Sequence, residues 1–122
     1  MSHKVLVVDD NEDLLDVLST TLSLAGYEVH TAASGDQFRS KITQLKPDMI
    51  LLDILLGEEN GVEIYEKMLS CGFSSRIPVV FISALAKDRP PTPPSPDRRY
   101  SLIGKPFSPE ALVEQLKVLL AA

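Results

Sequence analysis

Residues 48–53 read DMILLD, four apolar residues enclosed by two aspartates. A run of this length that is apolar throughout is typical of a strand buried on both faces of a parallel sheet. Two further runs have the same character, KVLVV at residues 4–8 and IPVVFIS at residues 77–83. Shorter runs at residues 28–32 and 101–103 also have strand character. The sequence therefore predicts five strands.

Segments with a helical spacing of apolar residues separate most of these strands. The clearest covers residues 12–24, where leucines recur three and four positions apart, acids occupy the first turn and Gly26 follows the end. Weaker patterns predict helices over residues 34–46, 62–69 and 108–120. Because strands and helices alternate, we predict an α/β fold, a doubly wound parallel sheet with helices on both faces.

Length and composition favour a single globular domain over residues 1–122. The chain is 44% hydrophobic and 24% charged, with a formal net charge of −5. The negative charge argues against direct nucleic-acid binding, and no apolar run approaches the roughly 20 residues that span a membrane. The N-terminus does not have the pattern of a signal peptide, and the single cysteine, Cys71, has no partner for an internal disulfide. We therefore expect a cytoplasmic protein.

Residues 88–97, DRPPTPPSPD, interrupt the alternation between the fourth and fifth predicted strands. Each proline lacks a backbone donor and disfavours a helix at the preceding residue. We therefore predict that an extended, proline-rich loop replaces the helix expected here. The segment includes a PxxP pattern, Pro90 to Pro93, so binding to an aromatic groove is the alternative to a simple solvated loop.

Polar residues follow four of the predicted strands, at the edge where open parallel sheets bind ligands. They are Asp9, Asp10, Asp53, Ser83 and Lys105. Converging carboxylates repel one another, by on the order of 4 kcal/mol for a pair about 4 Å apart at an effective dielectric of about 20. A divalent cation removes this cost, and carboxylates without histidine or cysteine suit Mg²⁺. One carboxylate can then attack phosphorus while a cation and a hydroxyl offset the charge.

These motifs resemble those of the response-regulator receiver family, and the resemblance covers the whole chain. The matching positions, at the family's spacing, are Asp9-Asp10, Asp53, Gly61, Ser83-Ala84 and Lys105-Pro106-Phe107. The resemblance implies a flavodoxin-like fold with strand order 2-1-3-4-5. It also implies a phosphoacceptor switch that assists its own phosphorylation and dephosphorylation, rather than an enzyme.

The resemblance also implies a role for each matching residue. Asp53 is the implied phosphoacceptor, Ser83 the hydroxyl that moves to the phosphoryl group, and Lys105 the cation that pairs with it. The implied cofactor is Mg²⁺, whose ligands are Asp9, Asp10, Asp53 and the backbone carbonyl of Leu55. The implied phosphoryl donor is a histidine kinase or a histidine phosphotransfer protein. The domain would then act on another protein, compete for phosphoryl groups or pass them along a relay, and the sequence does not choose among these.

The sequence departs from the family in two places. Leu102 stands where the family usually has an aromatic residue, and the fourth helix is interrupted by proline, so the usual signalling surface is altered. The residues two positions beyond Asp53 and Ser83 are Leu55 and Leu85, and neither side chain can orient an attacking water. We therefore predict slow loss of a phosphoryl group.

Two alternative functions remain open from the sequence. The altered surface is compatible with an interaction module that works without phosphorylation, although the acidic residues argue against it. A small α/β enzyme is a third interpretation. A phosphatase with an Asp-x-Asp nucleophile motif is disfavoured because Leu55 follows Asp53 and Ile54. A dinucleotide site is disfavoured because no glycine-rich loop follows the first strand.

Overall fold

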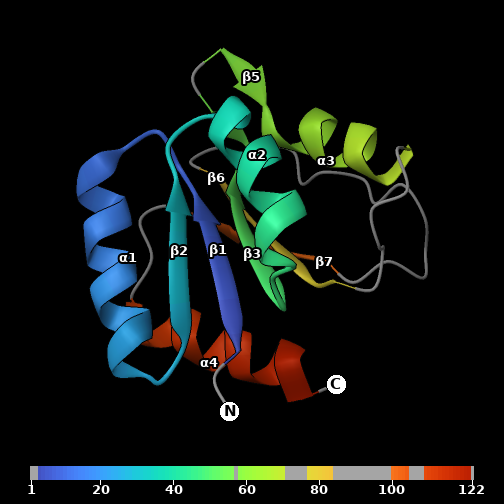
Figure 1. The fold of residues 1–122 in the computed structure, drawn as a ribbon. Helices are drawn as coiled ribbons and strands as arrows, with labels where there is room; N and C mark the ends of the chain where they lie inside the picture. Colours follow the sequence, from blue (N-terminus) through green and yellow to red (C-terminus); the bar gives the residue numbers. More distant parts are fainter. Residues whose placement is uncertain (1–2, 57, 71–76, 84–99, 105–108, 122) are drawn as a thin grey trace.

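The computed structural model describes residues 3–56, 58–70, 77–83, 100–104 and 109–121. Within these segments five strands form one parallel sheet (Figure 1). They are β1 (Lys4–Val8), β2 (Glu28–Ala32), β3 (Met49–Asp53), β6 (Val79–Ser83) and β7 (Tyr100–Gly104). Their spatial order is β2-β1-β3-β6-β7, which is 2-1-3-4-5 when the strands of this sheet are numbered along the chain. Every neighbouring pair is parallel.

Helices cover both faces of the sheet (Figure 1). They are α1 (Glu12–Leu24), α2 (Gly35–Leu45), α3 (Gly61–Ser70) and α4 (Pro109–Ala121). Buried residues of α1 and α4 pack on one face, and those of α2 and α3 pack on the other. The predicted doubly wound α/β fold is therefore confirmed. None of the helices in the described segments is long and apolar enough to span a bilayer.

The central strand β3 shows why its sequence is apolar throughout. All five of its residues are buried. Leu51 packs with leucines of α1 and α4, whereas Ile50 and Leu52 pack with Phe38 of α2 and Tyr65 of α3. Since successive side chains point to opposite faces, a strand covered on both sides has no position for a solvated polar residue until its end.

Local capping fixes where α1 and α2 begin. The Asn11 side chain accepts a hydrogen bond from the Leu14 amide over 3.2 Å at the start of α1. At the start of α2, Ser34 Oγ accepts from the Gln37 amide over 3.2 Å, and Gln37 Oε1 accepts in return from the Ala33 amide over 2.9 Å. This reciprocal pattern resembles a capping box; it satisfies one amide of the first turn of α2 and one amide just before the helix.

The structure differs from the sequence predictions after Asp53. No strand was predicted between residues 53 and 62, but a short antiparallel hairpin lies here, formed by β4 (Leu55–Leu56) and β5 (Glu59–Asn60). Strands of two residues are too short to give a hydrophobic period, so the sequence could not reveal them. The proline-rich loop predicted at residues 88–97 lies outside the described residues.

Candidate functional site

Asp9 directly follows β1, a strand that is buried over four of its five residues. Its side chain is fully buried, and its backbone amide donates to the Ala32 carbonyl over 3.1 Å. One carboxylate oxygen accepts a hydrogen bond from the Asn11 amide over 2.9 Å, while Asn11 itself caps α1. The turn between β1 and α1 therefore fixes the Asp9 carboxylate from the backbone and leaves the neighbouring Asp10 exposed.

Asp53 is the last residue of β3 and is only 3% exposed. The register between β1 and β3 pairs Val8 with Leu52. Asp9 and Asp53 are the next residues of these neighbouring strands, so they lie side by side at the carboxyl edge of the sheet. Ligand oxygens of Asp9, Asp10 and Asp53 all lie within 4.8 Å of one another. The convergence predicted for these three acids is confirmed.

The backbone just beyond Asp53 is tightly packed. The Ile54 amide donates to the Ile82 carbonyl over 2.9 Å, and the Gly61 amide donates to the Ile54 carbonyl over 2.7 Å. A Cβ atom on Gly61 would lie 2.2 Å from the Asp53 carbonyl oxygen, far inside van der Waals contact. Glycine is therefore required at residue 61 by the close approach of the Asp53 backbone.

The other predicted site residues are placed less completely. Ser83 is the last residue of β6, and Asp53 pairs with the preceding residue, Ile82, so Ser83 lies at the same edge of the sheet. Lys105 follows β7 directly in sequence but lies outside the described residues, as does Leu85. The backbone of Leu55 opens β4, two residues beyond Asp53. The roles of Ser83, Lys105 and Leu55 stay predictions.

A family comparison matches most of the chain. The model of the response regulator receiver domain covers residues 5–117. The chain belongs to this family. Receiver domains are phosphoryl-accepting switches of two-component signalling, and the match includes all three clustered acids.

Individual relatives agree with this assignment. The phosphate regulon transcriptional regulatory protein PhoB of Pseudomonas aeruginosa is 31% identical over 116 residues, which cover 95% of this chain and 51% of PhoB. The alkaline phosphatase synthesis transcriptional regulatory protein PhoP of Bacillus subtilis is 29% identical, over 98% of this chain and 49% of PhoP. The chain spans about half the length of the curated relatives it matches.

Solved structures show the same fold. The chemotaxis protein CheY4 of Vibrio cholerae superimposes with a TM-score of 0.80 at 27% identity, over 98% of this chain and 99% of CheY4. The receiver domain of NtrX from Brucella abortus gives a TM-score of 0.77 at 26% identity, over 97% and 98% of the two chains. Both likenesses extend across nearly the whole of this receiver domain.

The acidic residues fit the magnesium ion that this family implies. Three carboxylates offer hard oxygen ligands close enough to share one ion, and within the described segments theirs is the only cluster of at least three metal-binding side chains. Two of the three, Asp9 and Asp53, are buried, so an ion there would be held partly away from bulk water.

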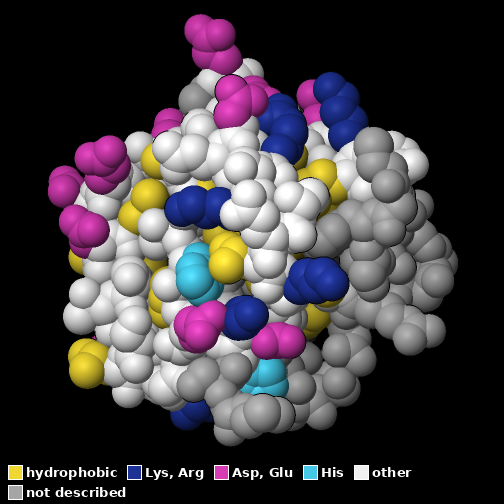
Figure 2. Space-filling view, viewed as in Figure 1, with side chains coloured by type: hydrophobic (Ala, Val, Ile, Leu, Met, Phe, Trp, Pro, Cys, Tyr) yellow, Lys and Arg dark blue, Asp and Glu magenta, His cyan; other side chains and the backbone are white. Residues whose placement is uncertain are grey.

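Figure 2 shows acidic side chains on one face of the receiver domain, toward the upper left over α1 and at the top near β5.

Two residues near the site were missed from the sequence. Asn11 holds Asp9 through its amide and begins α1 through its side chain, and an asparagine before an acidic first turn was a signal that could have identified the cap. Glu59 lies on β5 and pairs with Arg39 of α2 over 2.5 Å. Nothing in the sequence links two residues 20 positions apart, so this contact required the fold.

Proposed function

We propose that Asp53 accepts a phosphoryl group and that the added charge changes how this receiver domain binds a further protein. One observation carries the proposal: three carboxylates from two neighbouring strands converge at the carboxyl edge of the sheet. An acyl phosphate at Asp53 would add a doubly charged group with strong acceptor oxygens at a buried position.

The donor in this proposal is a phosphohistidine on a histidine kinase or a histidine phosphotransfer protein. A carboxylate oxygen of Asp53 attacks the phosphorus, the new O–P bond forms as the N–P bond breaks, and the imidazole keeps the electron pair of that bond. Asp53 suits this role because it closes the central strand β3. Asp9 is committed to the hydrogen bond from Asn11, which supports a holding role for Asp9.

The same residues would hold Mg²⁺. Asp9, Asp10 and Asp53 would supply carboxylate ligands and Leu55 its backbone carbonyl, and the bound ion would supply positive charge for the phosphoryl oxygens. We further propose that Lys105 pairs with the phosphoryl group and that the Ser83 hydroxyl donates a hydrogen bond to it. The place of Ser83 at the end of β6, next to β3, supports its part.

The output of the switch is proposed to be a protein–protein contact. A shift of Ser83 toward the phosphoryl group would move the end of β6 and, through their pairing, β7. The domain would turn over no external substrate and would act in the cytoplasm. The proline-rich segment at residues 88–97 precedes β7 in the sequence and is the proposed place where the output surface differs from that of its relatives.

Intact-mass spectrometry tests the proposal directly. The chain is incubated with Mg²⁺ and acetyl phosphate, beside Asp53→Asn and a matched control, Asp16→Asn, whose acid is exposed on α1. We expect one phosphoryl increment in the parent and the control, none in Asp53→Asn, and none when EDTA removes the metal. No increment in the parent, under conditions that label a known receiver, would reject phosphoryl acceptance and leave an interaction module as the function.

A further inference from the structure

Backbone pairing closes the hairpin after Asp53. Leu55 pairs with Asn60 and Leu56 with Glu59, and the hydrogen bond of 2.7 Å from the Gly61 amide to the Ile54 carbonyl closes its base. The Leu55 backbone is therefore coupled to β5. Any tilt of β5 must also move the carbonyl that is proposed to bind the metal.

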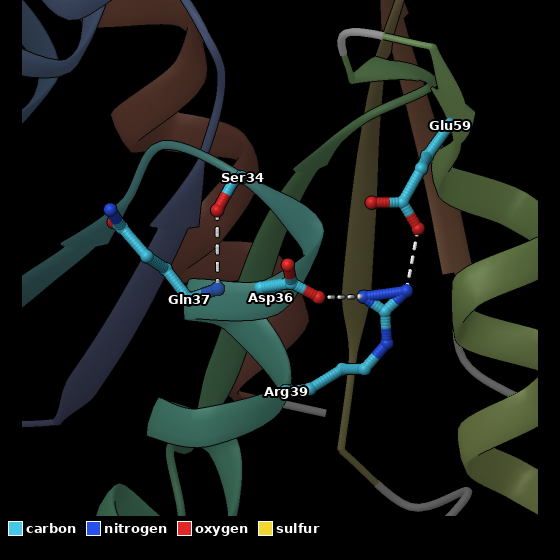
Figure 3. Close-up of polar contacts among 5 residues, drawn as sticks. All are labelled: Ser34, Asp36, Gln37, Arg39 and Glu59. Carbon is cyan, nitrogen blue, oxygen red and sulfur yellow. Dashed lines mark hydrogen bonds and ion pairs between the residues drawn. The ribbon is translucent and has the colours of Figure 1, made fainter.

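Helix α2 contacts this hairpin through an ion pair (Figure 3). Arg39 Nη2 lies 2.5 Å from Glu59 Oε2, and the other guanidinium nitrogen, Nη1, lies 3.4 Å from Asp36 Oδ1. Arg39 thus points from α2 toward β5, with one acid on its own helix and one on the hairpin. The Arg39 and Glu59 side chains are each a little under half exposed.

Gly35, at the first position of α2, meets the same carboxylate from a second side. A Cβ atom on this buried glycine would lie 2.4 Å from Glu59 Oε1 and 2.8 Å from Arg39 Nη1. The Glu59 carboxylate is therefore packed against the backbone of α2 and not only attracted to a cation. Phe38, the residue before Arg39 on α2, is fully buried in the core. This packing fixes the first turns of α2 against the sheet, so they can hold the Glu59 carboxylate in place.

We infer that Arg39 is a positioning residue of the metal site: together with Gly35 it holds Glu59, and through β5 and β4 it fixes the Leu55 carbonyl beside the acids. The inference rests on the proposed function, because Leu55 is a proposed ligand. It adds a residue of α2, an element that contributes no ligand, to the determinants of Mg²⁺ affinity.

For Arg39→Gln, electrostatics alone and positioning predict opposite changes in Mg²⁺ affinity. Removing the positive charge of Arg39 should strengthen Mg²⁺ binding if charge is all that matters, and removing the negative charge of Glu59 should weaken it. Positioning instead predicts weaker binding in both variants. It also predicts that Arg39→Gln with Glu59→Gln together cost no more than either change alone, because the pair is already broken.

The test is a titration with Mg²⁺ alone, followed by the backbone amide signals of Asp9 and Asp53 in the full chain. We expect Arg39→Gln and Glu59→Gln each to raise the Mg²⁺ dissociation constant about two- to fivefold, the range that a half-exposed ion pair supports. Lys117→Gln, which removes the same charge from α4 on the other face, is the control and should not weaken binding. An unchanged or lower dissociation constant in Arg39→Gln would overturn the inference.

Gly35→Ala gives an independent test from the other side of the contact. The added methyl group must displace the Glu59 carboxylate, while alanine is a better helix former than glycine. We expect weaker Mg²⁺ binding without loss of stability in urea, a combination that general damage to the fold would not produce. Parent-like Mg²⁺ binding in this variant would count against the inference, whereas normal Mg²⁺ binding without phosphoryl uptake in the parent would reject only the proposed function.

Discussion

The carboxyl edge of β1 and β3 carries acidic side chains, and so does the contact between α2 and β5, but the two regions hold them differently. Asp9 and Asp53 are 0% and 3% exposed; Asp9 follows β1 and Asp53 ends β3, two strands whose backbones are fixed by the sheet. The side chain of Asp36 is 98% exposed and that of Glu59 42%, and both carboxylates pair with the long side chain of Arg39. Changes at the buried edge should therefore have large effects, and changes at the surface small ones.

The largest effect is expected from the backbone beneath the buried acid. In Gly61→Ala the new methyl group would collide with the Asp53 carbonyl, which no side-chain rotation can relieve. We expect a loss of unfolding free energy of about 2–3 kcal/mol in urea, as for other overpacked sites. Gly26→Ala is the control: its methyl group would meet no atom within 4 Å, and only its φ of +98° is unfavourable. A milder effect at Gly61 than at Gly26 would contradict the comparison.

Neutralising the exposed member of the cluster should stabilise the protein when metal is absent. Asp10→Asn relieves repulsion among oxygens that lie within 4.8 Å of one another. In EDTA we expect a gain of about 1–3 kcal/mol in unfolding free energy, the range for such pairs between solvent-like and protein-like dielectrics. Saturating Mg²⁺ should stabilise the parent more than the variant and so reduce this gain.

Asp16→Asn on α1 provides the matched control for that measurement. Its acid is exposed and belongs to no metal-binding cluster among the described residues, so this variant should match the parent in EDTA and gain as much stability from Mg²⁺ as the parent does. If Asp10→Asn were destabilising in EDTA, repulsion would not be the dominant interaction at the cluster.

The lifetime of the phosphoryl group on Asp53 tests whether the residue at position 55 controls its hydrolysis. Leu55 stands two residues beyond Asp53 and carries no group that could orient water toward phosphorus. Leu55→Asn should shorten the lifetime of the phosphorylated protein, measured by intact mass after removal of acetyl phosphate. A parent lifetime no longer than that of the variant would refute the predicted slow dephosphorylation.

The smallest effect is expected where an exposed acid acts through space. Burial raises the pKa of the Tyr27 phenol above its ordinary value, and the nearby Glu114 carboxylate raises the pKa further. The folded state thus holds this proton more tightly than the unfolded chain. The associated stability is complete below the unfolded pKa of about 10 and is lost as the pH rises through the folded pKa.

Glu114→Gln should therefore lower the Tyr27 pKa without removing the part due to burial. Carbon-13 NMR of labelled tyrosine rings, with Tyr27→Phe to assign the signal, measures this change. A Tyr27 pKa that does not move in Glu114→Gln would show that this surface charge is screened by solvent.

Much of the fold was predictable because its signals are local. The helix expected over residues 12–24 is α1, and KVLVV is β1, since an amphipathic period and a fully apolar run are read within one segment. The hairpin β4–β5 was missed because its strands have two residues each. The pairing of Arg39 with Glu59 was missed because it depends on how α2 lies against β5.

The sequence by itself determined that Asp9, Asp10 and Asp53 would meet, because acids that end buried parallel strands share one edge of the sheet. It also determined the family, through the order and spacing of those acids with Ser83 and Lys105. Only the tertiary structure decided how near the oxygens come, why Gly61 must lack a side chain, and which residues of α2 support the hairpin. The physical reason is that strand and helix periods follow from neighbours in the chain, whereas close contacts between elements depend on the packing of the whole core.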